Sequence, residues 1–331
     1  MNQYYKIKLN FFDFSLKTEF FIKIFKILLF LLLVITIYTN NKILFLFSNN
    51  SKSLKVCICA IGKNENFYIQ EFINYYKEIG YNKIILYDNN DIDDERFDNI
   101  IKNDIDNGFV SIINYRGMRG MNINPQLKAY KDCYEKYNLK YDWLSFFDID
   151  EYLELIPKSL NIQSFLNNEK FINCQNIKIN WVYYINNNSL YYENKSLIER
   201  VNIPNFNLPV NYLIKSTVRG KLPINYWSLA ENPHTSLNKF NTCSSSGKII
   251  DYKSPYNKPP EFKFAFLKHL QYKSFEEYCL KIKRGRPIQQ YQSYREDKIK
   301  QLFESNKNNT EKLSILIKVF NSSKIIKIHQ K

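Results

Sequence analysis

The sequence predicts an α/β protein in which a single transmembrane helix precedes one domain with a mainly parallel sheet. Two observations lead to this prediction. Residues 20–39 form a long apolar run, and from Lys55 onward apolar segments of strand type alternate with segments of helical spacing. The chain has 331 residues, which is long enough to bury a sizeable core.

Composition excludes several classes of protein. Hydrophobic residues make up 45% of the chain and charged residues 24%, which excludes a disordered or fibrous protein. The net charge of +15 suggests an anionic partner, but the basic residues are scattered, and Lys, Asn, Ile, Tyr and Phe are over-used together. We therefore expect no nucleic-acid binding. Six cysteines without a Cys-x-x-Cys pair argue against a zinc ribbon and leave the redox compartment open.

Residues 20–39 read FFIKIFKILLFLLLVITIYT and predict a membrane anchor. About 20 apolar residues span the hydrocarbon core, and Lys23 and Lys26 can extend their side chains to the interface. Because lysines precede the apolar centre, the positive-inside tendency keeps the N-terminus cytoplasmic. No small-residue cleavage site follows, which argues against a removable signal peptide. The alternative is a buried or interfacial helix.

The remaining boundaries follow from this anchor. We expect a cytoplasmic tail at 1–19, a stem at 40–54, the α/β domain at 55–300 and a polar, helical extension at 301–331. In a eukaryotic cell this orientation corresponds to a type II membrane protein of the endoplasmic reticulum or Golgi.

Strands and helices alternate through the first half of the domain. Lys55–Gly62 is β-branched and apolar and predicts a buried strand, and Glu65–Gly80 has helical spacing and ends at a capping glycine. Further buried strands are expected at Lys83–Asn90 and Gly108–Tyr115, followed by a helix at Gln126–Lys140.

The second half is less regular. A fourth strand within Asp142–Leu155 runs into acidic residues, and strand-like pieces follow at IKINWVYY and LIKSTVRG. A pattern typical of helices returns over residues 274–304 and in the final KLSILIKVF.

The strongest chemical feature is Asp148-Ile149-Asp150-Glu151, which follows the apolar run Trp143–Phe147. Ligands collect at the strand ends of an open parallel sheet. Residues i and i+2 of an extended chain point the same way, so Asp148 and Asp150 can face one site and offer oxygen ligands to Mg²⁺ or Mn²⁺. A cation would also relieve the repulsion between the two carboxylates. The alternative is a pair of solvated acids at a helix start.

Two more segments lie where strands are expected to end. Asp88 follows the second strand and could meet a bound nucleotide, whereas the acidic run 91–95 fits a solvated loop without EF-hand spacing. Lys63, Asn64 and Glu65 follow the first strand, and backbone N–H groups and a lysine at such a turn can bind phosphate. The chain has no Walker A, GxGxxG or GxSxG motif.

Four segments, in this order, resemble inverting glycosyltransferases of the GT-A fold. CAIGKNENFYIQEFINYYKEIGYNKIILYDNND resembles their first nucleotide-binding β-α-β unit, and DWLSFFDIDEYLEL resembles their metal-binding Asp-x-Asp segment. KSTVRG and HTS, followed by LKHLQYKSFEEYCLKIKRGRP, are similar to the C-terminal part of glycosyltransferase family 92 and of related family-2-like enzymes. The resemblance covers residues 55–290.

This resemblance implies transfer of a sugar from a nucleotide-sugar donor, with UDP as the expected nucleotide, to a glycan or other hydroxyl acceptor. It implies inversion at the anomeric carbon and Mn²⁺ or Mg²⁺ on the diphosphate. Asp148 and Asp150 match the metal-binding pair, and His269 matches a third ligand or diphosphate contact; a structural histidine is the alternative. The matched nucleotide contacts are Lys63, Asn64, Glu65 and Asp88.

The reaction needs two further kinds of side chain. A general base must accept the proton of the acceptor hydroxyl, and Glu231 and Glu151 are the candidates. Cationic side chains must stabilise the charge on the leaving nucleoside diphosphate. The cations available for this are Lys273, Lys283, Arg284 and Arg286.

Two other functions stay open. A haloacid-dehalogenase-type phosphatase also carries Asp-x-Asp after a buried strand, but near the start of its domain, whereas two βα units come first here. A catalytically inactive, membrane-tethered sugar-binding or scaffold protein could keep the fold, although the intact Asp148 and Asp150 argue against lost turnover. Metal-dependent release of UDP from UDP-sugars separates a transferase from both.

Overall fold

The computed structural model describes residues 28–32, 36, 53–118, 124–222, 234, 241–251, 253–285 and 292–321. The chain divides into two compact units, Met1–Ser53 and Leu54–Lys331. In the first unit, residues 28–32 and 36 are helical. Among the residues described, no helix has both the length and the apolar character to cross a membrane. Most of the predicted anchor lies outside the described residues.

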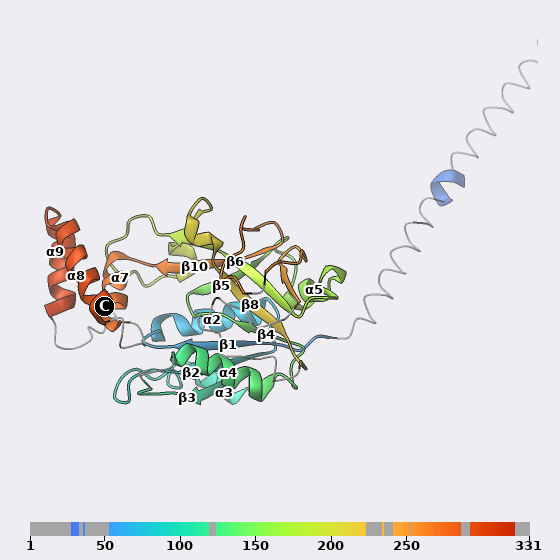
Figure 1. Cartoon of the computed structure of the whole chain (residues 1–331), viewed down its shortest axis with the longest axis horizontal. Coiled ribbons are helices and arrows are strands. Elements are labelled where there is room, and N and C mark those ends of the chain that lie inside the picture. Colours follow the sequence, from blue (N-terminus) through green and yellow to red (C-terminus); the bar gives the residue numbers. More distant parts are fainter. Residues whose placement is uncertain are drawn as a thin grey trace, which may run out of the picture. The chain divides into compact units, whose positions relative to one another are not determined.

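A mixed sheet forms the centre of the second unit (Figure 1). Its described strands follow the order β3-β2-β1-β4-β8-β6-β10-β5, and β7 and β9 pair with β6 outside this path. The strands are β1 Val56–Gly62, β2 Lys83–Asp88, β3 Val110–Asn114, β4 Trp143–Phe146, β5 Glu151–Leu155, β6 Asn176–Ile185, β7 Ile203–Asn205, β8 Ile214–Arg219, β9 Thr242–Ser244 and β10 Ala265–Tyr272.

Strands β1 to β4 are parallel, as the alternation of strands and helices predicts. β1 lies between β2 and β4, and β2 pairs with β3. Beyond β4 the directions mix, since β8 runs antiparallel to both β4 and β6. β10 is parallel to β6 and antiparallel to β5. The predicted α/β class is confirmed, and its sheet is parallel on one side and mixed on the other.

Helices cover both faces of the parallel half of the sheet (Figure 1). Val56, Ile58 and Ala60 of β1 pack into the core beneath α2, and the alternate residues Cys57 and Cys59 pack beneath α4. The helices of the domain are α2 Asn66–Glu78, α3 Lys102–Asp106, α4 Pro125–Tyr137, α5 Ile162–Leu166, α6 Leu197–Arg200, α7 Phe275–Arg284, α8 Gln292–Asn306 and α9 Thr310–Asn321, with 3-10 turns η1 Glu169–Phe171 and η2 Pro209–Tyr212.

The end of α2 confirms the predicted capping glycine. Gly80 has φ +95°, a left-handed conformation that glycine adopts without steric cost. The N–H of Gly80 donates to the Lys77 carbonyl at 3.2 Å, and the N–H of Tyr81 donates to the Tyr76 carbonyl at 3.0 Å. These two bonds are the Schellman pattern, which satisfies the last carbonyls of the helix and turns the chain into β2.

The segment predicted as a fourth strand is instead two strands joined by a turn. β4 ends at Phe146, residues 149–150 form a turn, and β5 begins at Glu151. The reasoning from residues i and i+2 of an extended chain therefore does not apply to Asp148 and Asp150. The alternative of acids at a helix start is also wrong, because Glu151 starts a strand that pairs with β10.

Helices α7, α8 and α9 gather beside the end of β10 (Figure 1) and share an apolar cluster of their own. Phe275 and Cys279 of α7 pack in it with Ile315, Leu316 and Val319 of α9. The predicted start of the C-terminal extension, residue 301, lies inside α8.

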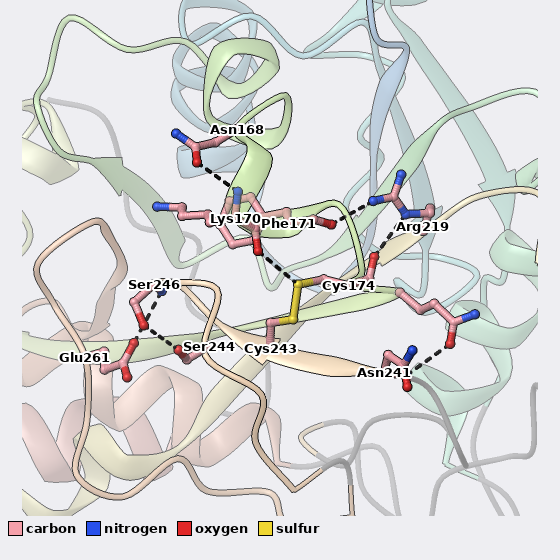
Figure 2. The surroundings of a disulfide bond; sticks show 11 residues. Asn168, Lys170, Phe171, Cys174, Arg219, Asn241, Cys243, Ser244, Ser246 and Glu261 are labelled. Atoms are coloured by element: carbon pink, nitrogen blue, oxygen red, sulfur yellow. Dashed lines mark hydrogen bonds between the residues drawn. A yellow bond between two sulfur atoms is a disulfide. The ribbon is translucent and has the colours of Figure 1, made fainter.

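Two disulfides cross-link elements that are distant in sequence. Cys59 of β1 bonds to Cys133 of α4, and Cys174 bonds to Cys243 of β9. Figure 2 shows the second bridge, where the Arg219 guanidinium donates to the carbonyls of Phe171 at 2.9 Å and Cys174 at 3.0 Å. The sequence did not predict these pairings.

Replacing Cys174 by Ser is expected to lower the free energy of unfolding by about 2–4 kcal/mol, because the bridge restricts the unfolded chain. The two cysteines are 69 residues apart, so the loop that it closes is long. Urea unfolding of the chain in non-reducing buffer measures the change. Cys279→Ser, which alters a buried free thiol, is the control and should cost less. Equal midpoints for wild type and Cys174→Ser would show that no bridge forms.

Candidate functional site

The candidate site lies where β1, β2 and β4 end, beside β10 and α7. Asp150, after β4, has an Oδ1 3.8 Å from Nε2 of His269 on β10 and an Oδ2 2.7 Å from Nζ of Lys281 on α7. Glu65, after β1, pairs with Arg284 at the end of α7 at 2.8 Å. The chain thus brings three predicted segments together: the β1–α2 turn, the Asp-x-Asp turn and the segment from His269 to Arg284.

Asp150 is a buried carboxylate that stays ionised. Its side chain is 8% exposed. Burial alone would raise the pKa of Asp150, but the positive charges of Lys281 and Lys273 outweigh it and hold this pKa well below its usual range. Asp150 therefore offers negatively charged oxygen atoms at neutral pH.

Asp148 is more firmly held than Asp150. Its Oδ2 lies 2.8 Å from Nζ of the buried Lys215 on β8. Its Oδ1 accepts hydrogen bonds from Gln126 Nε2 at 2.5 Å and from the Tyr130 hydroxyl at 3.0 Å, both on α4. Burial would raise the pKa of Asp148, but Lys215 lowers it. One ion pair and two hydrogen bonds therefore occupy much of this carboxylate.

Glu151 is fully buried next to the same lysine. Its Oε2 accepts from the Asp148 backbone N–H at 3.0 Å, and its Oε1 lies 3.5 Å from Lys215 Nζ. Burial raises the pKa of Glu151 well above its usual range, and Lys215, which Glu151 shares with Asp148, offsets this only in part. The contacts of Glu151 fix the turn that carries the two aspartates.

His269 lies on β10 with its imidazole packed against Trp181, the ring centres being 4.0 Å apart. Burial lowers the pKa of His269 to about 4, so the ring is neutral at pH 7. Its Nδ1 is buried and has no hydrogen-bond partner among the described residues. A neutral, buried imidazole beside a carboxylate is typical of a metal ligand.

The turn after β1 is built on three side chains that the sequence singled out. Lys63 Nζ pairs with Asp91 at 2.8 Å. Asn64 has φ 52°, a left-handed conformation that asparagine tolerates better than most residues, and its N–H donates to Asn90 Oδ1 at 2.7 Å. The buried Glu65 precedes α2.

Asp88, at the end of β2, has protein partners on both carboxylate oxygens. Its Oδ2 lies 3.0 Å from the Arg116 guanidinium, and its Oδ1 accepts from the N–H of Asn90 at 2.9 Å. The same guanidinium donates to the carbonyls of Asp91 and Glu95 at 2.7 and 2.6 Å. Asp88 and Arg116 therefore shape the acidic loop, residues 91–95, and these contacts show no role for Asp88 in binding a nucleotide.

A pocket with about 780 Å³ of open space, continuous with solvent, lies between the β1–α2 turn, the acidic loop and α7. Both signs of charge line it. Its acidic lining residues are Glu65, Asp94, Glu95 and Glu277, and its basic ones are Lys273, Lys281, Lys283 and Arg284. The predicted phosphate-binding turn thus faces the predicted cations across one pocket.

Sequence reasoning missed two lysines of this site. Lys281 lies three residues before Arg284 and shares its face of α7, a spacing that could have revealed it. Lys215 lies in β8, which reads IKSTVR, and this mixture of polar and apolar residues gives no local signal of a buried ion pair. Glu231 and Arg286, two of the predicted residues, lie outside the described residues.

The donor set fits a hard divalent cation. Asp150 supplies carboxylate oxygen, and Nε2 of the neutral His269 imidazole faces this carboxylate at 3.8 Å. Within the described part of the chain, no three His, Cys, Asp or Glu side chains are placed to hold a metal by themselves.

Comparison with known proteins identifies the family. The model of glycosyltransferase family 92 matches residues 52–302. A glycosyltransferase family 92 protein of Ricinus communis is 29% identical over 122 residues, 36% of this chain and 20% of that protein. One of Oryza sativa subsp. japonica is 26% identical over 121 residues, 35% of this chain and 19% of that protein. The chain thus matches about a fifth of the length of these curated relatives.

Solved structures overlap with the chain only in part. TarS 1–349 of S. aureus in complex with UDP-GlcNAc aligns with a TM-score of 0.30 and 15% identity, over 42% of this chain and 37% of that one. The same fragment in complex with UDP gives a TM-score of 0.31 and 12% identity, over 50% and 47% of the two chains. The assignment rests on the family match, which spans more than half of the chain: the protein belongs to glycosyltransferase family 92.

Proposed function

We propose that this protein transfers a sugar from a nucleotide-sugar, with UDP as the expected nucleotide, to a hydroxyl group of a glycan or other acceptor. One observation supports the proposal most directly. In a family 92 chain, a pocket is lined by Lys273, Lys281 and Arg284, and its Lys281 pairs with Asp150. His269 lies 3.8 Å from the same carboxylate. An ionised carboxylate, a neutral imidazole and clustered cations suit a metal-bound diphosphate.

Asp150 and His269 would hold Mn²⁺ or Mg²⁺, and the donor phosphates would complete its coordination. When bound, the metal would act as a Lewis acid that neutralises charge on the leaving diphosphate. Asp148 would act mainly through position, since Lys215, Gln126 and Tyr130 already occupy its carboxylate.

The side chains of the pocket have separate tasks in this proposal. The cations of α7 would bind the diphosphate and favour its departure. An inverting reaction also needs a base on the acceptor side. Burial raises the pKa of Glu151 and the Asp148 N–H occupies one of its oxygens, which favours a positioning role for it. We therefore favour Glu231 over Glu151 as the base.

We further propose that residues 20–39 anchor the protein with its N-terminus cytoplasmic and its catalytic domain on the far side. Two disulfides in the domain support this orientation, because such bonds persist mainly outside the reducing cytosol. Protease protection of intact vesicles tests it. Digestion of the domain by protease added from the cytoplasmic side would refute the orientation.

The activity is tested with a panel of nucleotide-sugars and Mn²⁺, first by thermal stabilisation of the chain and then by product release. Ligands that bind only the folded state raise its stability. Release of UDP that EDTA abolishes supports the transferase. Phosphate release from phosphomonoesters would instead favour the phosphatase, and sugar binding without turnover would favour the scaffold.

His269→Ala is expected to weaken Mn²⁺ binding in the presence of UDP by at least about tenfold, because even lost outer-shell contacts cost metal sites 10–100-fold. Isothermal titration calorimetry measures the affinity. His234→Ala is a matched control, since His234 also packs on Trp181 but hydrogen-bonds to the Ile214 carbonyl at 3.0 Å. Equal losses in the two variants would count against a ligand role for His269.

A further inference from the structure

We propose that Lys281 exchanges partners at this site. In the structure its ammonium group pairs with Asp150, and it turns to the donor diphosphate when a divalent cation takes this carboxylate. The inference rests on the proposed function and deepens it, because it names the residue that couples metal binding to donor binding.

The two oxygens of Asp150 face two different partners. Oδ2 lies 2.7 Å from Lys281 Nζ, and Oδ1 faces His269 Nε2 at 3.8 Å. The Lys281 side chain is 28% exposed, whereas that of Asp150 is 8% exposed. Lys281 is therefore the solvent-side partner of a buried carboxylate, and it can leave without opening the core.

Two other cations of the pocket, Lys273 and Arg284, are less free to move. Lys273 lies 2.9 Å from Glu65, and Arg284 lies 2.8 Å from the same carboxylate. Moving them would leave Glu65 buried without its counter-ions, which is costly. Lys281 differs because a metal at Asp150 would take over the neutralising role that it gives up.

The helix that carries Lys281 is fixed, so the exchange needs only a side-chain motion. Glu277 of α7 makes two hydrogen bonds with Arg200, at 2.7 and 2.6 Å, and this pair is buried. Arg284 also donates to the Lys63 carbonyl of the β1–α2 turn. The flexible four-carbon stem of lysine gives Lys281 a choice of partners around the pocket that it lines.

Electrostatics gives the exchange its direction. An ammonium group and a divalent cation on one carboxylate repel each other, so Lys281 and the metal compete for Asp150. A diphosphate carries the opposite charge and attracts both. Lys281 should therefore oppose binding of the metal alone and favour binding of the nucleotide.

The experiment compares Lys281→Met with wild type in the full chain, using Mn²⁺ alone and then UDP at saturating Mn²⁺ as probes in isothermal titration calorimetry. We expect at least about tenfold tighter binding of Mn²⁺ alone, and at least about tenfold weaker binding of UDP. Opposite changes in the two affinities are a result that a general loss of structure would not give.

Lys318→Met is the matched control. Lys318 of α9 pairs with Glu276 of α7 at 3.1 Å, so this change also removes one positive charge and one ion pair, but away from the pocket. Both of its affinities should equal those of wild type. Unchanged or weaker binding of Mn²⁺ to Lys281→Met overturns the exchange. If the exchange fails in this way but the wild-type chain binds Mn²⁺ and UDP, the proposed function is still supported. If the wild-type chain binds neither Mn²⁺ nor UDP, the exchange and the proposed function are both overturned.

Discussion

Asp150→Asn is expected to lower the rate of sugar transfer by about a thousandfold or more while the protein stays folded. The amide keeps the shape of the side chain but removes the charge that would hold a divalent cation, and metal stabilisation of a leaving group is worth several kcal/mol. Oδ1 of the buried, ionised Asp150 lies 3.8 Å from Nε2 of His269. Initial rates of UDP release measure the effect, and thermal unfolding checks the fold.

The chain offers a matched control for this substitution. Asp91-Ile92-Asp93 repeats the same three residue types in the acidic loop, and Asp93 is exposed. Asp93→Asn should therefore turn over at nearly the wild-type rate. Wild-type turnover in Asp150→Asn would remove the basis of the metal site, and equal losses in both variants would point to a general effect of lost negative charge.

The parallel half of the fold was predictable because its signals are local. β1 and β2 are apolar runs whose residues pack on both faces of the sheet. α2 has one apolar face, and the hydrogen bonds around Gly80 end this helix locally. The strand ends then place the turn of Lys63–Glu65 near the Asp-x-Asp segment in any parallel sheet of this order.

The mixed half depends on long-range pairing, which no local pattern encodes. β5 is a strand only because β10, more than 100 residues later in the chain, pairs with it. The turn at Asp150 follows from that pairing, and so does the position of His269 opposite Glu151. Lys281 reaches Asp150 across 131 residues of sequence. Its role becomes visible only when the fold brings the two segments together.

Glu277→Gln is expected to lower the free energy of unfolding by about 3–5 kcal/mol, because it leaves the Arg200 guanidinium buried without its counter-ion. Glu277 and Arg200 are 4% and 8% exposed, and the Tyr68 hydroxyl also donates to this carboxylate. Burial would raise the pKa of Glu277, but Arg200 lowers it below its ordinary value of 4.5. Urea unfolding at pH 7 measures the loss.

The pH dependence separates this ion pair from simple packing. A carboxyl group whose folded pKa is lowered stabilises the fold above its unfolded pKa and loses this contribution as pH falls through the folded value. The difference between wild type and Glu277→Gln should therefore shrink as pH falls below 4.5. Glu193→Gln, in an exposed pair with Lys195, should leave the urea midpoint nearly unchanged, because surface ion pairs contribute little to stability. A pH-independent difference would mean that Glu277 holds α7, and with it Lys281, by shape and not by charge.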